Sequence, residues 1–124
     1  MIKVLVKREK FSNIPLSVEI KGHALFAPSG EDIVCAGVST LSQTIVFSLQ
    51  NLLLIDPPLK IRDGYMFIGF PAALQTSQKQ QVELLFETLL LGLKEISREY
   101  PDFISYNEFL VKGENGGSDT LFTV

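Results

Sequence analysis

The feature that most constrains the fold is a change of hydrophobic period along the chain. Short stretches with an apolar residue at every second position alternate with two long stretches in which apolar residues recur every three or four positions. The first pattern is typical of a strand with one buried face, and the second of an amphipathic helix. Together they predict an α+β fold, with about five short strands in a mostly antiparallel sheet packed with two long helices, in the order β-β-loop-α-β-β-α-β.

Five segments are expected to form the strands: 2–7, 16–21, 59–62, 65–70 and 103–111. The turn-forming pair Ser12-Asn13 separates the first two, which are therefore expected to pair antiparallel. Asp63-Gly64 is a favoured two-residue hairpin turn and is expected to join the third strand to the fourth.

The first long helix is expected from residue 33 to residue 54, with Asp32 as its N-cap. Spacings of three and four predict one core-facing stripe on this helix: Val34, Val38, Leu41, Ile45, Leu49 and Leu52. Cys35, Ser39 and Ser42 form a second stripe beside the first, at positions i, i+4 and i+7.

A second long helix is expected from residue 77 to about residue 100, because Ser77 and Gln80 have capping-box spacing and Pro101 ends the pattern. Its predicted core stripe is Val82, Leu85, Leu89, Leu93, Ile96 and Tyr100. Phe86 and Leu90 widen this apolar surface, which indicates either deeper burial or a dimer contact.

Length and composition indicate one domain. The 124 residues are expected to form a single domain over 1–111 and a mobile, glycine-containing tail over 112–124. A net charge of −3 and a pI near 5.1 argue against a nucleic-acid-binding role, since phosphate binding needs clustered Lys and Arg. No signal peptide and no membrane span are expected. A lone cysteine cannot form an internal disulfide, which favours the cytoplasm.

The residues that can carry chemistry gather between Gly22 and Ser39. This stretch holds the only histidine of the chain, His23, and its only cysteine, Cys35. A thiol and an imidazole held on neighbouring rigid elements can act as nucleophile and base. A lone cysteine is otherwise usually a core residue, and a lone histidine usually has a structural hydrogen bond, so both interpretations remain open at this point.

The expected helix places Cys35 in its first turn. There the unpaired N–H groups and the helix dipole favour a thiolate, whereas the charge of Asp32 opposes it unless that carboxylate caps the backbone. Ser39 either donates a hydrogen bond near the sulfur or is a small residue that allows close packing. One Cys and one His do not complete a zinc site, and neither GxGxxG nor a P-loop is present, so no metal or other cofactor is expected.

Residues 25–31 are expected to form a loop, because they contain Pro28, Ser29 and Gly30. Two apolar residues in this loop, Leu25 and Phe26, either pack on the edge of the core or line a substrate groove or form a lid over it.

At these residues the sequence resembles the bacterial ribosomal-processing cysteine proteases, the Prp family. The resemblance covers about residues 1–111 and extends to the Asp63-Gly64-Tyr65 hairpin and to the run LFETLLLGLK at 85–94. Gly37 stands where alanine is common in the family. The residues that carry the resemblance most specifically are Gly22-His23-Ala24, Gly30, the DIVCA run at 32–36, Val38 and Ser39.

The resemblance implies a cysteine endopeptidase that removes the N-terminal extension of large-subunit ribosomal protein twenty-seven and so supports ribosome maturation in the cytoplasm. It implies that His23 and Cys35 are catalytic and that Asp32 and Ser39 are accessory. It also implies a homodimer. From the charge and the hydropathy described above, no direct binding to nucleic acid or to a membrane is expected. The residues expected to bind the substrate are Gly22, Leu25, Phe26 and Gly30.

Two other functions remain open from the sequence. One is a non-enzymatic ribosome assembly or docking module, which would bind a basic ribosomal protein while Cys35 is only structural. The other is a redox-sensing thiol, which is disfavoured because the chain has no second cysteine to resolve a sulfenic acid.

Overall fold

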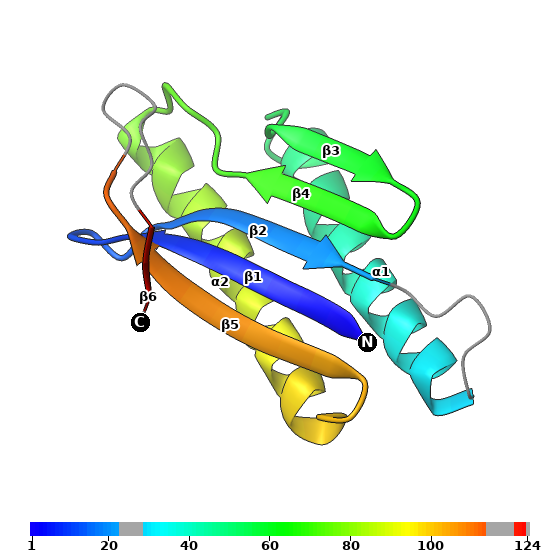
Figure 1. Cartoon of the computed structure of the whole chain (residues 1–124). Helices are drawn as coiled ribbons and strands as arrows, with labels where there is room; N and C mark the ends of the chain where they lie inside the picture. Colours follow the sequence, from blue (N-terminus) through cyan, green and yellow to red (C-terminus); the bar gives the residue numbers. More distant parts are fainter. Residues whose placement is uncertain (23–28, 114–120, 124) are drawn as a thin grey trace.

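The computed structural model describes residues 1–22, 29–113 and 121–123, with the ranges 29–32 and 121–123 described for their backbone only. Within them, two helices and six strands form a single α+β layer structure (Figure 1). The helices are α1 (Ser29–Asn51) and α2 (Thr76–Glu99). The strands are β1 (Ile2–Glu9), β2 (Pro15–Lys21), β3 (Leu59–Arg62), β4 (Tyr65–Gly69), β5 (Ile104–Val111) and β6 (Leu121–Thr123).

This architecture confirms the predicted fold class and the predicted order of the first five strands and two helices. The sequence did not indicate β6, which adds three residues of the expected tail to the sheet by pairing with β5. Residues 114–120 and 124 lie outside the described part, so the predicted mobility of the tail there stays a prediction.

The strands lie side by side in the order β3-β4-β2-β1-β5-β6. The two predicted hairpins, β1–β2 and β3–β4, are both antiparallel, as are the pairs β2–β4 and β5–β6. Within the described residues the exception is the pair β1–β5, which is parallel and aligns Ile2 with Ile104. A hairpin cannot join two parallel strands, so the connection must cross over. The chain between β1 and β5, which includes both helices and three other strands, makes this crossover.

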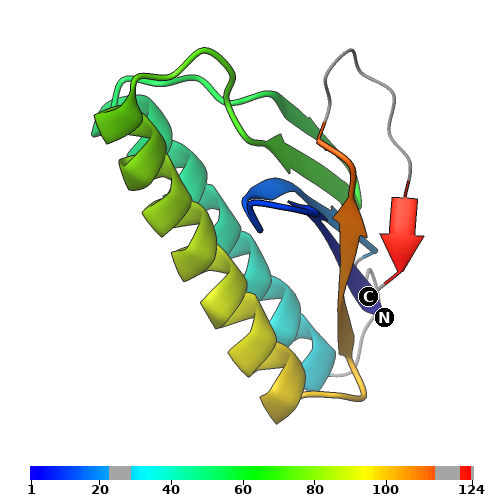
Figure 2. The same cartoon turned by 90° about the vertical axis from the view of Figure 1, so that its left-hand side faces the viewer.

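Both helices are crossover connections, and they lie on the same face of the sheet (Figure 2). Because β2 and β3 each run antiparallel to β4, they are parallel to each other, and α1 joins them. In the same way, α2 carries the chain from β4 to β5. The two helices also pack against each other.

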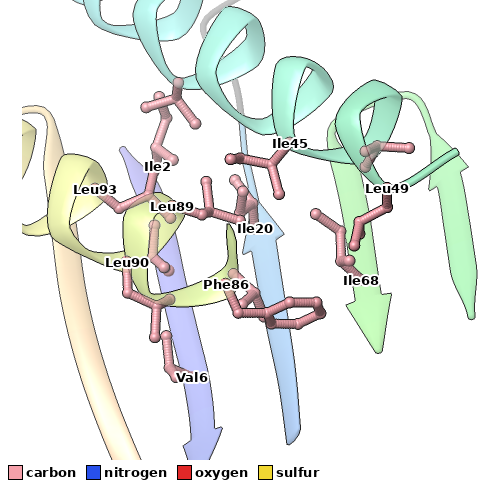
Figure 3. Close-up of a cluster of buried hydrophobic side chains, with 14 of the residues drawn as sticks. Ile2, Val6, Ile20, Ile45, Leu49, Ile68, Phe86, Leu89, Leu90 and Leu93 are labelled. Atoms are coloured by element: carbon pink, nitrogen blue, oxygen red, sulfur yellow. The ribbon is translucent and has the colours of Figure 1, made fainter. Parts of the chain in front are cut away.

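The core fills the space between the helices and this face of the sheet (Figure 3). From the strands, Ile2, Val4 and Val18 point into it, and each is at most 2 % exposed. Phe86 and Leu90 are fully buried there, so their extra apolar surface serves depth of burial. The buried core residues on α1 are Val34, Val38, Ile45, Val46 and Leu49, and those on α2 are Val82, Phe86, Leu89, Leu90 and Leu93.

The ends of the helices differ from the predicted ones. α1 ends at Asn51 rather than at residue 54, so Leu52 leaves the predicted core stripe and is 77 % exposed. α2 starts one residue early, and the side chain of Gln78 accepts a hydrogen bond from the backbone N–H of Gln75 at 3.1 Å. The predicted box at Ser77 and Gln80 was therefore wrong in position, although it identified the correct turn.

One segment of α1, Ile33–Asn51, is long and apolar enough to cross a membrane when judged by length and composition alone. One such helix is weak evidence, because the core helix of a globular fold meets the same criterion. Here the apolar stripe of α1 is covered by the sheet and by α2.

A charge cluster around the buried Arg8 ties β1 to α2 and β5. The guanidinium of Arg8, which is only 5 % exposed, donates to the Glu87 carboxylate at 2.7 and 2.9 Å and to Glu108 at 2.9 Å. Tyr106 donates to the same Glu108 carboxylate at 2.5 Å, and Lys94 lies 3.4 Å from it. Burial acts to raise the pKa of Glu108, but the hydrogen bonds from Arg8 and Tyr106 outweigh it and hold this pKa below its ordinary value of 4.5.

We expect Glu108→Gln to lower the free energy of unfolding by about 1.5–3 kcal/mol at pH 7, because it removes a charged acceptor from a buried guanidinium. A lowered pKa stabilises the fold above pH 4.5, and this contribution is lost as the pH falls through the folded-state pKa. The difference from wild type in urea unfolding should therefore shrink below pH 4.5.

Glu95→Gln is the matched control, since Glu95 pairs with Arg98 on the exposed surface of α2. It should change the stability by no more than about 0.5 kcal/mol at any pH. An equal loss for Glu108→Gln at pH 3 and pH 7 would show that the carboxylate charge is not what stabilises this cluster.

Candidate active site

A cleft of about 290 Å³ lies between α1 and the β3–β4 hairpin, and it contains Cys35. The first wall comes from α1: Cys35, Val38, Ser39, Ser42 and Gln43. The opposite wall comes from the hairpin: Ile61, Arg62, Asp63, Gly64, Tyr65 and Met66. The lining is completed by Ile2 of β1, Ile20 of β2 and Gly22, which directly follows β2.

The hairpin is held against the end of β2 at the rim of this cleft. The backbone N–H of Gly22 donates to the carbonyl of Gly64 at 2.9 Å, which joins the end of β2 to the tip of the β3–β4 turn. Gly22 has φ +92°, and a Cβ there would stand 2.5 Å from the carbonyl oxygen of Met1. No side chain is tolerated in this conformation without a shift of the backbone. Gly22 therefore fixes where the chain leaves the sheet, one residue before His23.

Cys35 is half-buried, packs against the core on one side and lines the cleft on the other. It is the seventh residue of α1, because this helix begins at Ser29. The predictions that Asp32 is the N-cap and that Cys35 lies in the first turn were therefore wrong. Only the first four N–H groups of a helix lack an intrahelical partner, and the dipole effect falls off within the first turn, so the helix terminus acts on Cys35 less than expected.

The early start of α1 also corrects the predicted loop. Residues 29–31, including Gly30, are helical, whereas Leu25 and Phe26 lie outside the described residues. Pro28 and Ser29 were interpreted as loop formers, but serine is favoured at a helix N-terminus, and Glu31 and Asp32 fall in the first turn, where the dipole favours acidic residues. His23 also lies outside the described part, so the distance between its imidazole and the Cys35 sulfur stays open.

The second stripe of α1 faces the cleft. Cys35, Ser39 and Ser42 line it together, as their i, i+4 and i+7 spacing predicts for one side of a helix. Their depths differ, because Ser39 is exposed, Cys35 is half-buried and Ser42 is 1 % exposed. The cleft thus runs from an open part beside Ser39 to an inner part beside Ser42.

Charged groups on the hairpin wall are held in place by neighbouring strands. The Arg62 guanidinium lies 4.3 Å from the centre of the Tyr65 ring, and the Tyr65 hydroxyl donates to Glu19 at 2.5 Å. This hydrogen bond raises the pKa of Tyr65. Burial acts to raise the pKa of Glu19, but the bond from Tyr65 and the charge of Lys21 bring it below its ordinary value. Glu19 alternates with the core residues Val18 and Ile20, so these contacts lie on the face of the sheet away from α1 and support the hairpin wall from behind.

The hairpin wall was not predicted from the sequence to be part of the site. The turn of this hairpin, Asp63-Gly64, was predicted. The local turn pattern gave no indication, however, that β4 pairs with β2 and brings the turn to Gly22. Ile2 and Ile20 are core residues of two predicted strands, and they also line the cleft. Among the described residues, no group of three or more His, Cys, Asp and Glu side chains lies close enough to hold a metal ion.

Comparison with known proteins agrees with this geometry. Residues 1–105 match the family described as cysteine protease Prp. The ribosomal processing cysteine protease Prp of Bacillus subtilis (strain 168) is 36% identical over 108 residues, which span 82% of this chain and 92% of that protein.

Solved structures share the fold. The crystal structure of SMU.848 from Streptococcus mutans has 36% sequence identity and a TM-score of 0.76, over 87% of this chain and 93% of that one. The ribosomal processing protease Prp from S. aureus, solved in complex with a substrate peptide, has 26% identity and a TM-score of 0.72, over 87% of this chain and 99% of that one. A second S. aureus structure holds a covalently linked product peptide, with 27% identity, a TM-score of 0.70 and the same coverage.

The family match extends over most of the chain, and the similarity to the B. subtilis relative extends over most of both proteins. The half-buried cysteine in a cleft is consistent with the chemistry of that family. The chain is a cysteine protease that belongs to the Prp family.

Proposed function

We propose that this protease uses Cys35 as nucleophile and His23 as general base and acid, and that it removes the N-terminal extension of large-subunit ribosomal protein twenty-seven. The observation that carries the proposal is the position of Cys35 in a cleft whose rim is Gly22. Gly22 immediately precedes His23, and the Gly64 carbonyl anchors it there. The imidazole is thus attached to a fixed point on the rim of the cleft that contains the thiol.

The reaction follows from the two groups. His23 takes the proton of the Cys35 thiol, and the sulfur forms a bond to the scissile carbonyl carbon. When the carbon–nitrogen bond breaks, the protonated imidazole gives its proton to the leaving amine. A water molecule then attacks the thioester with His23 as base, which releases the new carboxylate and restores the thiol.

The accessory and substrate-binding roles are part of the same proposal. Ser39 lines the open part of the cleft one helical turn from Cys35, where its hydroxyl can hydrogen-bond a group beside the sulfur. Asp32, whose backbone lies in the first turn of α1, is proposed to position the site, and Gly22, Leu25, Phe26 and Gly30 to contact the peptide. Apolar cleft residues such as Ile61 and Met66 suit a substrate with apolar side chains before the cleavage point.

The names of the relatives support a ribosomal substrate. The B. subtilis relative is a ribosomal processing protease, and the S. aureus protease was solved with a substrate peptide and with a covalently linked product peptide. A covalent product is consistent with the nucleophilic mechanism that we propose. We also propose that the protein acts in the cytoplasm, where its lone cysteine stays reduced.

The docking-module alternative requires Cys35 to be inert packing. Its half-buried position on the wall of a cleft argues against that role, since a purely structural cysteine would be enclosed by the core. The redox-sensing alternative is disfavoured, because the chain has no second cysteine to resolve a sulfenic acid.

Cys35→Ala should abolish cleavage of a peptide that spans the extension junction, with a loss of at least about a thousandfold in kcat, because no other group supplies the covalent step. Cleavage is measured by mass spectrometry. Ser97→Ala is the control, since Ser97 donates to the Lys94 carbonyl on α2 and does not line the cleft. Cleavage by Cys35→Ala at the wild-type rate would rule out the assigned nucleophile.

Iodoacetamide should inactivate the wild type at neutral pH, whereas an inert thiol would react slowly.

Gly22→Ala should impair both stability and catalysis. The positive φ and the contact with the Met1 carbonyl predict a loss of about 1–3 kcal/mol in the free energy of unfolding. A displaced His23 predicts a fall in kcat/KM of about a hundredfold, as for a misplacement of about 1 Å. The matched control is Gly37→Ala, where the nearest atom to a new Cβ is Ile96 Cδ1 at 4.0 Å.

Gly37→Ala should retain activity and gain up to about 1 kcal/mol, because alanine is the better helix former. Activity and urea unfolding are measured for both variants. Wild-type kcat/KM for Gly22→Ala would contradict the proposed role of Gly22 in placing His23.

We also propose that the protein is a homodimer. Several large apolar side chains on the helices stay exposed in the single chain, including Phe47 at 56%, Leu84 at 68% and Leu91 at 62% exposure. Association would remove such apolar area from water. Sedimentation velocity should give a species of twice the chain mass of 13.8 kDa at micromolar concentration. A single species at the chain mass over the whole accessible concentration range would contradict the dimer.

A further inference from the structure

The Ser42 hydroxyl is the unusual polar group of the cleft. Its Oγ is buried and, within the described part of the chain, has no hydrogen-bond partner. The residue is 1 % exposed and lines the same cleft as Cys35, two helical turns further along α1. An unpartnered buried hydroxyl destabilises the folded state, because its hydrogen bonds to water are lost and none replaces them.

Other polar side chains on the same helix avoid this cost. Thr44 donates to the Thr40 carbonyl at 2.7 Å, Ser48 to the Thr44 carbonyl at 2.8 Å, and Asn51 to the Phe47 carbonyl at 3.0 Å. Each bonds to the carbonyl four residues back, which is the usual arrangement for a polar side chain within a helix. Ser42 does not use the carbonyl available to it.

A need for small volume alone does not explain this serine. Alanine is as small, is the better helix former and would bury no polar atom. The other side chains that line the cleft, polar Ser39 and Gln43 included, form no hydrogen bond with this hydroxyl in the described part of the chain. A group that enters the cleft is therefore the partner available to this hydroxyl, and serine can turn its Oγ among the staggered rotamers to meet it.

We propose that Ser42 is a substrate-binding residue, whose hydroxyl donates a hydrogen bond to an oxygen of the bound peptide at the inner end of the cleft. This inference rests on the proposed function, because it takes the cleft beside Cys35 as the peptide site. The acceptor is a carbonyl oxygen, either of the peptide backbone or of a peptide side chain. In either case Ser42 contributes to binding rather than to the covalent step.

The test uses Ser42→Ala in the full chain with a peptide that spans the extension junction. The loss of one hydrogen bond should lower kcat/KM by about two- to tenfold. This decrease should come from a higher KM, with kcat unchanged. In the Cys35→Ala background, the Kd for a fluorescently labelled peptide should rise by the same factor. The melting temperature of Ser42→Ala should not fall, since the variant removes an unpartnered hydroxyl. Ser97→Ala should leave KM and Kd unchanged.

An alanine scan of the peptide distinguishes the two acceptors. If the acceptor is a side chain, one peptide substitution will remove the difference between wild type and Ser42→Ala. If it is the backbone, the difference will persist through the whole scan. Wild-type kcat/KM and Kd for Ser42→Ala would overturn the inference while leaving the protease assignment intact. A wild-type protein that does not cut the peptide would instead overturn the proposed substrate.

Discussion

Burial of both helices on a single face of the sheet is the constraint from which the rest of the structure follows. Because both crossovers lie on that face, the stripe on α1 and the stripe on α2 are covered together in one core. Once α1 is fixed in this way, the residues beside its stripe must point along the edge of the core rather than into it. Cys35 lies on that boundary, touching the core and lining the cleft. Rigid placement of the thiol is thus a consequence of core packing.

The cleft exists because the β3–β4 hairpin extends past the core and is fastened at its tip. Pairing of β4 with β2 sets the register, and the bond from Gly22 to the Gly64 carbonyl holds the turn at the point where β2 ends. A single backbone contact therefore links the wall of the cleft to the start of the segment that carries His23. The Tyr65–Glu19 bond adds a second connection between the same two strands.

Two groups of buried polar atoms show how stability and function separate in this fold. Arg8, far from the cysteine in the described structure, is fully engaged with Glu87 and Glu108, and the cluster joins three elements. Ser42, inside the cleft, has no hydrogen-bond partner among the residues that the structure describes. Natural proteins satisfy nearly all buried polar groups, and exceptions concentrate where a ligand completes the network. The unsatisfied hydroxyl, which destabilises the fold, therefore lies in the cleft, whereas the buried guanidinium that joins three elements is fully hydrogen-bonded.

The amino-acid sequence by itself determined the element types, their order, the β3–β4 turn and most of the core stripes, because hydrophobic period and turn chemistry are local. It also singled out Cys35 and His23. The start of α1 at Ser29 was missed, since Pro28 to Gly30 suits a loop as well as a helix N-terminus. Only the tertiary structure decided that β1 lies parallel to β5, that Leu52 is exposed and that Ser42 shares a cleft with Cys35. These three features depend on contacts between segments that are distant in the chain. Such contacts are decided by burial and strand pairing in the whole fold, so they leave no pattern in the local sequence.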